Sequence, residues 1–224
     1  MITRILSALV MAPVAIAAIW LGSGYFLALV IIVGIAAAFE WYRLISDEGI
    51  EGVNTLWLLL GFVYIGVACL VLVWLRNIEP QGFQIILWFF VVIWTTDIRA
   101  YFSGKAIGGP KLAPGISPNK TWAGFFGGLV LAIVSSVILM NLADSSMFTF
   151  GLSMVIAACI VLSIVGQFGD LLESSVKRKL GVKDSGSLIP GHGGVLDRID
   201  AILLAAPVAG IIPVLLEFGD ASWK

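Results

Sequence analysis

The fold class of this chain is decided by one run of sequence, Leu56 to Leu75, which reads LWLLLGFVYIGVACLVLVWL. The run carries no charged residue. It has the length of about 20 apolar residues that an α-helix needs to cross the hydrocarbon core of a bilayer. Lipid offers no partner for open backbone N–H and C=O groups, so such a run must cross as a helix. The sequence therefore predicts a transmembrane helix here.

Six more runs have the same apolar character and nearly the same length. They are Ile5–Leu21, Tyr25–Tyr42, Ile85–Phe102, Trp122–Asn141, Phe148–Phe168 and Ile199–Leu216. The sequence lacks the alternating ten-residue pattern of a membrane β-barrel. We therefore expect an all-α, polytopic integral membrane bundle of about seven transmembrane helices, forming a single domain over residues 1–224.

The composition supports this interpretation and excludes other classes of protein. Of the 224 residues, 60% are hydrophobic and 12% are charged, and the mean hydropathy is +1.06. A soluble domain of this length could not hide that much apolar surface behind a polar shell, and a disordered chain would be far less hydrophobic. The formal net charge of −1 lacks the basic excess of a nucleic-acid-binding protein, so no nucleic acid partner is expected.

The distribution of Lys and Arg predicts the orientation, because cytoplasmic loops carry the excess of these residues. Alternate numbering of the loops places Arg76 and Lys224 on one side, whereas Arg99 lies inside a run. The other side receives Arg4, Arg43, Lys105, Lys111, Lys120, Lys177, Arg178, Lys179, Lys183 and Arg198. We expect the N-terminus in the cytoplasm and the C-terminus outside, in the plasma (inner) membrane. A cleaved signal peptide at the first run is an alternative that stays open.

Two polar segments, both on the predicted cytoplasmic side, are long enough to hold chemistry. The second of them, residues 170–200, follows the sixth run directly. If the helix continues there, four side chains share one face, namely Asp170, Glu173, Ser174 and Lys177. Asp197 and Asp200 share a face where the last run begins. Between them lies a Gly-rich stretch around His192, where the backbone can approach a ligand closely.

This second segment has the composition of a metal–phosphate site. Mg²⁺ typically binds one or two carboxylates plus substrate phosphates, and phosphates bind Lys, Arg and free backbone N–H groups. The alternative is a solvated loop whose basic residues follow the positive-inside rule. Unpaired carboxylates would be costly at the edge of the hydrocarbon, which favours the site. His192, the only histidine, is either a proton shuttle or a hydrogen-bonding residue of the turn.

The first segment, Gly104–Thr121, carries a different set of polar groups. Asp97 and Tyr101 precede it, one helical turn apart. Prolines stiffen the loop and glycines let it turn, while Ser117, Lys120 and Thr121 supply donors of the kind that hold a nucleotide. A plain basic connecting loop is the alternative. Since both segments face the same side, we expect Ser117 and Lys120 to lie near Asp170 and Asp197 in one cavity, with Asp97 and Tyr101 as its floor.

Five short runs in these segments resemble the signature of one enzyme family. They are DIRAY from Asp97, SPNKTW from Ser117, SSVKR from Ser174, KDSG from Lys183 and LIPGHGGVLDRID from Leu188. The chain thus resembles the phosphatidate cytidylyltransferases, also called CDP-diacylglycerol synthases. The resemblance implies that CTP and phosphatidic acid are converted to CDP-diacylglycerol and pyrophosphate in phospholipid biosynthesis. It also implies one or two Mg²⁺ sites, with room for a monovalent ion, and leaves a homodimer open.

The residues and the resemblance together predict the site. The expected catalytic residues are Asp170, Asp197, Lys177, Arg178 and His192. The expected substrate-binding residues are Ser117, Lys120, Thr121, Lys183, Asp184, Arg198, Asp97 and Tyr101. The expected metal ligands are Asp170 and Asp197, followed by Asp200 and Glu173.

The chain departs from the family pattern at two positions. Ala123 stands where the family commonly has a glutamate, and Arg99 replaces a small or apolar residue. Three other functions therefore stay open at this stage. They are a CTP-dependent lipid-alcohol kinase of similar architecture, a transporter suggested by Asp97 and Arg99 inside a span, and a non-catalytic homologue.

Overall fold

The computed structural model of the chain describes residues 2–46, 54–142, 151–189 and 193–221. Within the described residues, each predicted membrane run overlaps one helix, so the all-α bundle is confirmed. The elements are α1 (Ile2–Leu21), α2 (Ser23–Ser46), α3 (Asn54–Arg76), α4 (Gly82–Ile107), β1 (Lys111–Ala113), β2 (Ser117–Thr121), α5 (Trp122–Leu142), α6 (Leu152–Lys179) and α7 (Leu196–Ala221).

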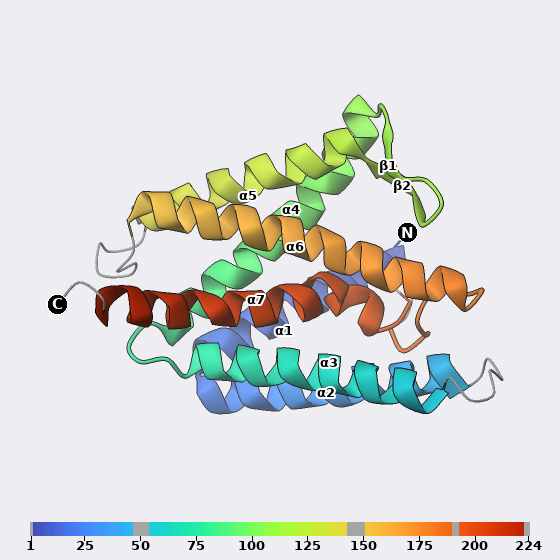
Figure 1. Ribbon diagram of the computed structural model, residues 1–224, viewed down its shortest axis with the longest axis horizontal. Coiled ribbons are helices and arrows are strands. Elements are labelled where there is room, and N and C mark those ends of the chain that lie inside the picture. Colours follow the sequence, from blue (N-terminus) through green and yellow to red (C-terminus); the bar gives the residue numbers. More distant parts are fainter. Residues whose placement is uncertain (1, 47–53, 143–150, 190–192, 222–224) are drawn as a thin grey trace.

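The helices are arranged in three neighbouring groups (Figure 1). The pair α6 and α7 runs through the middle, α2 and α3 pack together on one side of it, and α4 and α5 pack together on the other. Helix α1 contacts both α2 and α4. Five of the helices in the described part of the chain, α2 to α6, are long and apolar enough to cross a membrane.

Small residues let α4 and α5 approach closely. A Cβ atom on Gly124 would lie 2.7 Å from the carbonyl oxygen of Ala100, and one on Gly128 would lie 2.8 Å from that of Thr96. Glycines four residues apart on one helix face are a known means of close helix contact in lipid. The helices therefore pack backbone against backbone at this point, where a larger side chain would separate them.

Polar side chains link the helices deep in the bundle. The indole N–H of Trp88 on α4 donates to the hydroxyl of Ser136 on α5 at 3.0 Å, and the hydroxyl of Thr96 donates to that of Ser163 on α6 at the same distance. Lipid tails give helices little hydrophobic reason to associate, so packing and such hydrogen bonds have to hold them together.

The close approach of α6 and α7 positions the acidic residues of both helices. A Cβ atom on Gly169 would lie 2.6 Å from the carbonyl oxygen of Asp200. The backbone of α6 thus runs directly against the first turns of α7. Because of this contact, Asp170 and Glu173 stand beside Asp197 and Asp200, although they are distant in the sequence.

The polar segments have more regular structure than predicted. Helix α4 continues to Ile107 and α6 to Lys179, the second extension being the one that we expected. The rest of the first segment forms an antiparallel hairpin instead of an irregular loop, with the register Lys111–Thr121 and Ala113–Ser117. Strands of three and five residues are too short to give a clear alternating pattern in the sequence.

We predict that Gly128→Ala lowers the free energy of unfolding of the protein in detergent micelles by about 1–3 kcal/mol. This is the usual cost of forcing an extra group into a packed contact. Gly66→Ala on α3 is the matched control, because no atom lies within 4 Å of its added Cβ. The control should be neutral or slightly stabilising, since Ala favours helix over Gly. Equal melting temperatures for the two variants would contradict the tight α4–α5 contact.

Candidate active site

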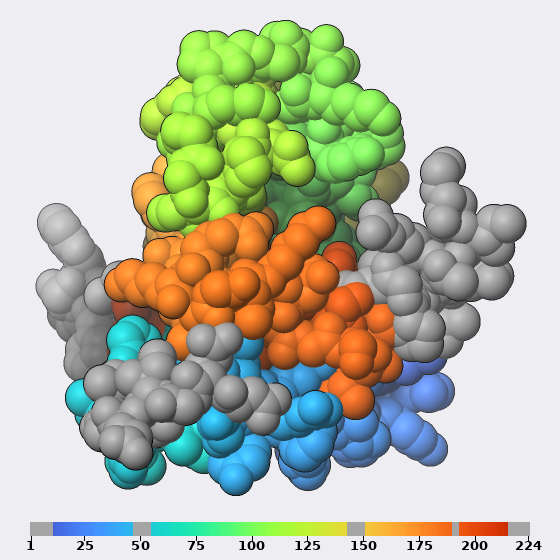
Figure 2. Space-filling model, turned by 90° about the vertical axis from the view of Figure 1, so that its right-hand side faces the viewer, coloured from blue at the N-terminus to red at the C-terminus, as the bar shows by residue number. Residues whose placement is uncertain are grey.

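The polar groups of the two motif segments gather at one end of the bundle. The hairpin, the last turns of α6, the first turn of α7 and the last turns of α2 all lie there, at the right of Figure 1. Figure 2 looks onto this end, with the hairpin (green) above, the end of α6 and the following loop (orange) in the middle, and α2 (blue) below. The two segments singled out from the sequence therefore share one face of the molecule.

A salt bridge joins the two segments. The ammonium group of Lys120, on β2, lies 2.5 Å from Oδ2 of Asp170, on α6. Ser174, one turn further along, donates to Oδ1 of the same carboxylate at 3.3 Å. Arg178 donates from Nε to the carbonyl oxygen of Ile116 in the hairpin at 3.3 Å. The expected meeting of the segments is confirmed for Lys120 and Asp170.

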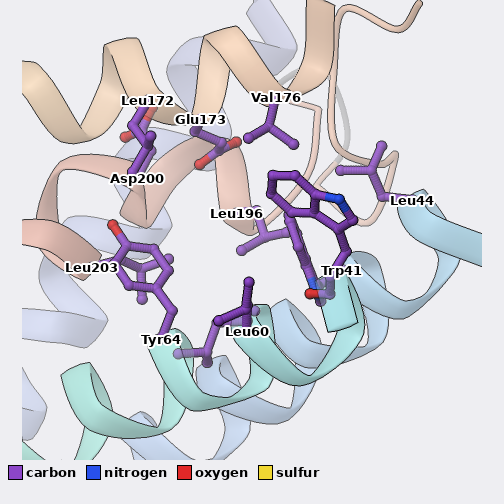
Figure 3. A pocket seen from close by; sticks show the side chains of 13 residues that line it. Trp41, Leu44, Leu60, Tyr64, Leu172, Glu173, Val176, Leu196, Asp200 and Leu203 are labelled. Atoms are coloured by element: carbon purple, nitrogen blue, oxygen red, sulfur yellow. The ribbon is translucent and has the colours of Figure 1, made fainter. Parts of the chain in front are cut away.

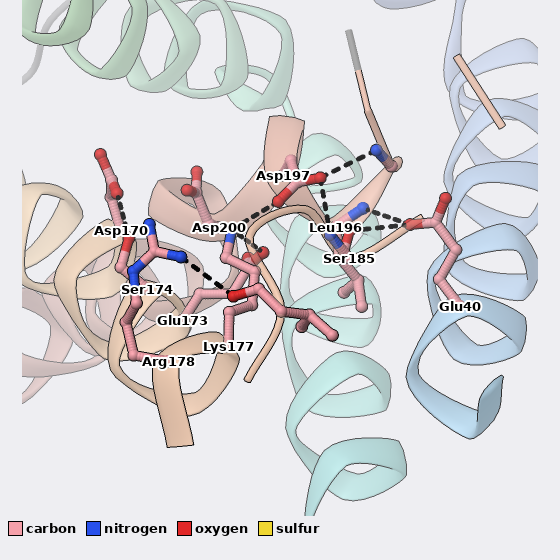
Figure 4. Close-up of polar contacts among 12 residues, drawn as sticks. Glu40, Asp170, Glu173, Ser174, Lys177, Arg178, Ser185, Leu196, Asp197 and Asp200 are labelled. Atoms are coloured by element: carbon pink, nitrogen blue, oxygen red, sulfur yellow. Dashed lines mark hydrogen bonds and ion pairs between the residues drawn. The ribbon is translucent and has the colours of Figure 1, made fainter. Parts of the chain in front are cut away.

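Lys177 is the buried cation of the site. Its ammonium group donates to Oε1 of Glu173 at 3.0 Å and also to Oδ1 of Asp197 (Figure 4). The side chains of Lys177 and Asp197 are each only 8% exposed. Buried charges of this kind are tolerated when they are paired and hydrogen-bonded. Lys177 thus ties the end of α6 to the start of α7.

Asp197 organises the turn that precedes α7. Its Oδ2 atom accepts hydrogen bonds from the amides of Ser185, at 2.9 Å, and Gly194, at 2.8 Å. Asp197 lies ahead of the apolar stretch of α7, which begins at Ile199. Burial raises the pKa of Asp197, but the hydrogen bonds from Lys177 and the two amides lower it more, so the pKa falls below its ordinary value.

Five acidic side chains surround this network, and we call them the carboxylate cluster: Asp97, Asp170, Glu173, Asp197 and Asp200. The charges of Asp170, Glu173 and Asp97 all act on Asp200, and those of Lys120 and Arg198 act on Asp97. Oε2 of Glu173 is buried and has no hydrogen-bond partner among the described residues. The cluster therefore brings five carboxyl groups together, of which Asp170, Glu173 and Asp197 are paired with Lys120 or Lys177.

The cluster suits a cation that is shared with a ligand. Within the described residues, no three His, Cys, Asp or Glu side chains converge on one metal position. Mg²⁺ commonly binds only one or two carboxylates and completes its coordination with substrate phosphates and water. Asp170 is the more accessible of the two expected ligands, since its side chain is 33% exposed against 8% for Asp197.

An apolar pocket of about 190 Å³ adjoins the cluster, between α2 and α3 on one side and α6 and α7 on the other. Glu173 and Asp200 lie along its edge, together with the ring of Tyr64 (Figure 3). Leucine and tryptophan side chains form much of the remaining wall, among them Trp41, Leu60 and Leu203. The apolar chain of a ligand would meet a matching surface here.

The remaining predicted residues have varied positions. The hydroxyl of Thr121 is buried and accepts the amide of Gly124 at 3.1 Å, so it caps α5. Tyr101 contacts Phe102 and Lys105 on its own helix. The other residues fall into three groups: Ser117 in β2, exposed positions at Lys183, Asp184 and Arg198, and His192, which lies outside the described residues.

The sequence analysis missed one residue of this site, Glu40 on α2. Its side chain is buried and accepts a hydrogen bond from the amide of Leu196, at 2.9 Å, the first residue of α7. The signal that could have identified it is a lone acidic residue in an apolar run, because such residues in membrane helices are usually paired and functional.

We predict that Lys177→Met destabilises the protein by about 3–5 kcal/mol, because Glu173 and Asp197 would be left buried without their cation. The matched control is Lys179→Met, two residues away and exposed, which should change stability by less than about 0.5 kcal/mol. Thermal unfolding in detergent micelles measures both. Similar losses for the two variants would show that the buried pairs do not stabilise the site.

Comparison with known proteins gives consistent results. A model of the cytidylyltransferase family matches residues 51–216. The phosphatidate cytidylyltransferase of Brucella abortus biovar 1 (strain 9-941) is 38% identical, with 91% of this chain and 90% of the relative covered. The enzyme of the same name from Rickettsia bellii (strain RML369-C) is 37% identical, with coverages of 92% and 87%. The matched residues include both segments that form the site, and the chain belongs to the cytidylyltransferase family.

Proposed function

We propose that this chain transfers the cytidylyl group of CTP to phosphatidic acid, which gives CDP-diacylglycerol and pyrophosphate. The observation that carries the proposal is the Lys120–Asp170 salt bridge, because it joins the two family motifs in one polar site at the end of an apolar bundle. The relatives named phosphatidate cytidylyltransferase support the same reaction.

The proposed location is the inner (plasma) membrane, with the site at the cytoplasmic surface. The excess of Lys and Arg on this side of the bundle supports that orientation, with the N-terminus inside and the C-terminus outside. CTP would arrive from the cytoplasm, and the phosphate of the lipid would lie at the same interface. The apolar pocket beside Glu173 and Asp200 would receive the start of an acyl chain. A lipid can then react without leaving the bilayer, which would cost about 0.8 kcal/mol per CH₂.

Basic side chains would bind the phosphates of both substrates. Lys120 and Lys177 are placed against the carboxylate cluster, and Arg178, on α6, donates a hydrogen bond to the hairpin at Ile116. Lys183 follows on the exposed loop. Bound phosphates would compete with Asp170 and Asp197 for these ammonium groups. Substrate binding would therefore rearrange ion pairs that already exist.

In the proposed reaction, an oxygen of the lipid phosphate attacks the α-phosphorus of CTP. A new P–O bond forms, the bond from the α-phosphorus to the bridging oxygen breaks, and pyrophosphate leaves with the electron pair. A phosphate monoester is largely ionised near neutral pH, so a general base is not required. The task of the protein is then to align the two substrates and to stabilise charge on the phosphate oxygens.

The carboxylate cluster fits the Mg²⁺ that this reaction calls for. Asp170 and Asp197 are the proposed ligands, and Asp200 and Glu173 are weaker candidates beside them. The orphaned Oε2 of Glu173 and the closeness of the other carboxyl groups of the cluster support a cation there. Bound Mg²⁺ would neutralise charge on the phosphates and on the pyrophosphate leaving group. In the structure, Lys120 forms an ion pair with Asp170, and Lys177 forms one with Asp197.

The decisive assay uses purified protein, CTP labelled on the cytosine, phosphatidic acid and Mg²⁺. Labelled lipid is the expected product. A CTP-dependent lipid kinase would instead release labelled CDP and leave the lipid unlabelled, and absence of both products would indicate a non-catalytic homologue. The lipid kinase and the non-catalytic homologue thus each have their own outcome.

We predict that Asp170→Asn and Asp197→Asn reduce the rate of labelled-lipid formation by at least about 100-fold, in the range found when a charged group at a reaction centre is removed. Asparagine keeps the size of the side chain and removes its charge. Glu79→Gln is the control, because Glu79 is exposed in the turn between α3 and α4 and should retain full activity. Full activity in Asp197→Asn would exclude this residue as a ligand.

We also predict that alanine at Lys120, Lys177, Arg178 or Lys183 raises the KM for CTP or phosphatidic acid by about tenfold, since each loses a charged hydrogen bond to phosphate. Lys105→Ala and Lys179→Ala are the controls. They carry the same charge on exposed positions of α4 and α6, and their KM values should change little. Small and equal effects at all six positions would mean that these residues only set the membrane orientation.

A further inference from the structure

Glu40 lies where a carboxylate is expensive to bury. Helix α2 is one of the apolar spans, yet the side chain of Glu40 is only 2% exposed. It also lies outside residues 51–216, the segment matched by the family model. Acidic residues within membrane helices are rare, and they usually have hydrogen-bond partners and a function. The structure shows the partners of Glu40.

Glu40 binds the start of α7 and the loop before it. Its Oε2 atom accepts the amide of Leu196 at 2.9 Å and the hydroxyl of Ser185 at 3.3 Å (Figure 4). Leu196 is the first residue of α7. The first amides of a helix have no partner within the helix, and that end carries a partial positive charge. The carboxylate therefore caps α7 from a different helix.

Two glycines of the motif are explained by this contact. A Cβ atom on Gly186 would lie 2.7 Å from Oε1 of Glu40, and one on Gly194 would lie 2.5 Å from Oε2 and 2.1 Å from Oγ of Ser185. Any larger residue at either position would push the loop away from the carboxylate. The loop is thus built to close around Glu40.

The same short stretch of backbone also holds Asp197. Ser185 donates its amide to Asp197 and its hydroxyl to Glu40. Gly194 donates its amide to Asp197, and Leu196 donates its amide to Glu40. Glu40 and Asp197 therefore both hold Ser185 and the residues at the start of α7, and Asp197 in turn accepts a hydrogen bond from Lys177.

We propose that Glu40 is a positioning residue for the cytidylyl transfer. Through Ser185 and the start of α7, Glu40 fixes the positions of Asp197 and Lys177. This inference rests on the proposed function. Among the described residues, the hydrogen bonds of Glu40 go to Ser185 and Leu196, and we infer that it acts on Asp197 and Lys177 through them. Loss of Glu40 should therefore lower the rate of the chemical step more than it weakens substrate binding.

The first test is steady-state kinetics of labelled-lipid formation by the full chain in lipid nanodiscs. Glu40→Gln keeps one acceptor oxygen but loses the charge, and we expect its kcat to fall about tenfold. For Glu40→Ala we expect kcat to fall about 100-fold. These values lie in the range seen for residues that orient the groups in direct contact with a ligand. The KM for CTP should change less than about threefold, and Glu79→Gln should behave as wild type.

A double-mutant cycle tests the route through Ser185. If Glu40 acts through this hydroxyl, the variant with both Glu40→Ala and Ser185→Ala should be no slower than Glu40→Ala alone. Rate losses that multiply would show that the two residues act independently, which would overturn the proposed route.

Amide hydrogen exchange tests the contact without any need for activity. In Glu40→Ala the amides of Ser185 and Leu196 should exchange at least about tenfold faster, while those of α4 and α5 remain unchanged. If the wild-type protein makes no labelled lipid, but these two amides still exchange faster in Glu40→Ala, then the proposed reaction is rejected and the contact stands. Two results would overturn the positioning role. One is unchanged exchange at these amides. The other is exchange that rises evenly over all helices in both Glu40 variants, in proportion to the activity that each has lost.

Discussion

The polar end of this bundle depends on one interaction, the pairing of the buried ammonium group of Lys177 with two carboxylates. The ammonium group lies between Glu173 on its own helix and Asp197 on the next, in a place where an unpaired charge would be strongly destabilising. Two neighbouring carboxylates are also paired. Lys120 forms a salt bridge with Asp170, and the amide of Leu196 donates a hydrogen bond to Glu40. Four parts of the chain are thus joined by charges that each need a partner.

These pairs can form only because the helices approach one another closely. Gly169 sets the backbone of α6 against that of α7 beside Asp200, and Gly124 and Gly128 do the same for α5 and α4. Close packing at these points places the hairpin over the end of α6 and brings the acidic residues of α6 and α7 together. The small residues inside the membrane therefore determine where the charges at its surface meet.

Much of this organisation follows from the sequence, and some of it does not. Long apolar runs such as Leu56–Leu75 identify the helices, because the bilayer permits little else. The meeting of Lys120 with Asp170 was predictable from topology and motif. The hairpin was missed because its strands are too short for a periodic signal, and Glu40 because its partners, Ser185 and Leu196, are about 150 residues away in the chain. The sequence also does not reveal that Lys177 pairs with Asp197, since pairing across helices depends on their packing.

The most direct test of the account is a crystal structure of the protein in lipid with Mg²⁺ and a CTP analogue that cannot react. The account predicts that the triphosphate lies between β2 and the ends of α6 and α7, with Lys120 on phosphate and the cation on Asp170. A nucleotide bound at the opposite end of the bundle, near the turn between α3 and α4, or one that contacts only one of the two motif segments, would contradict it.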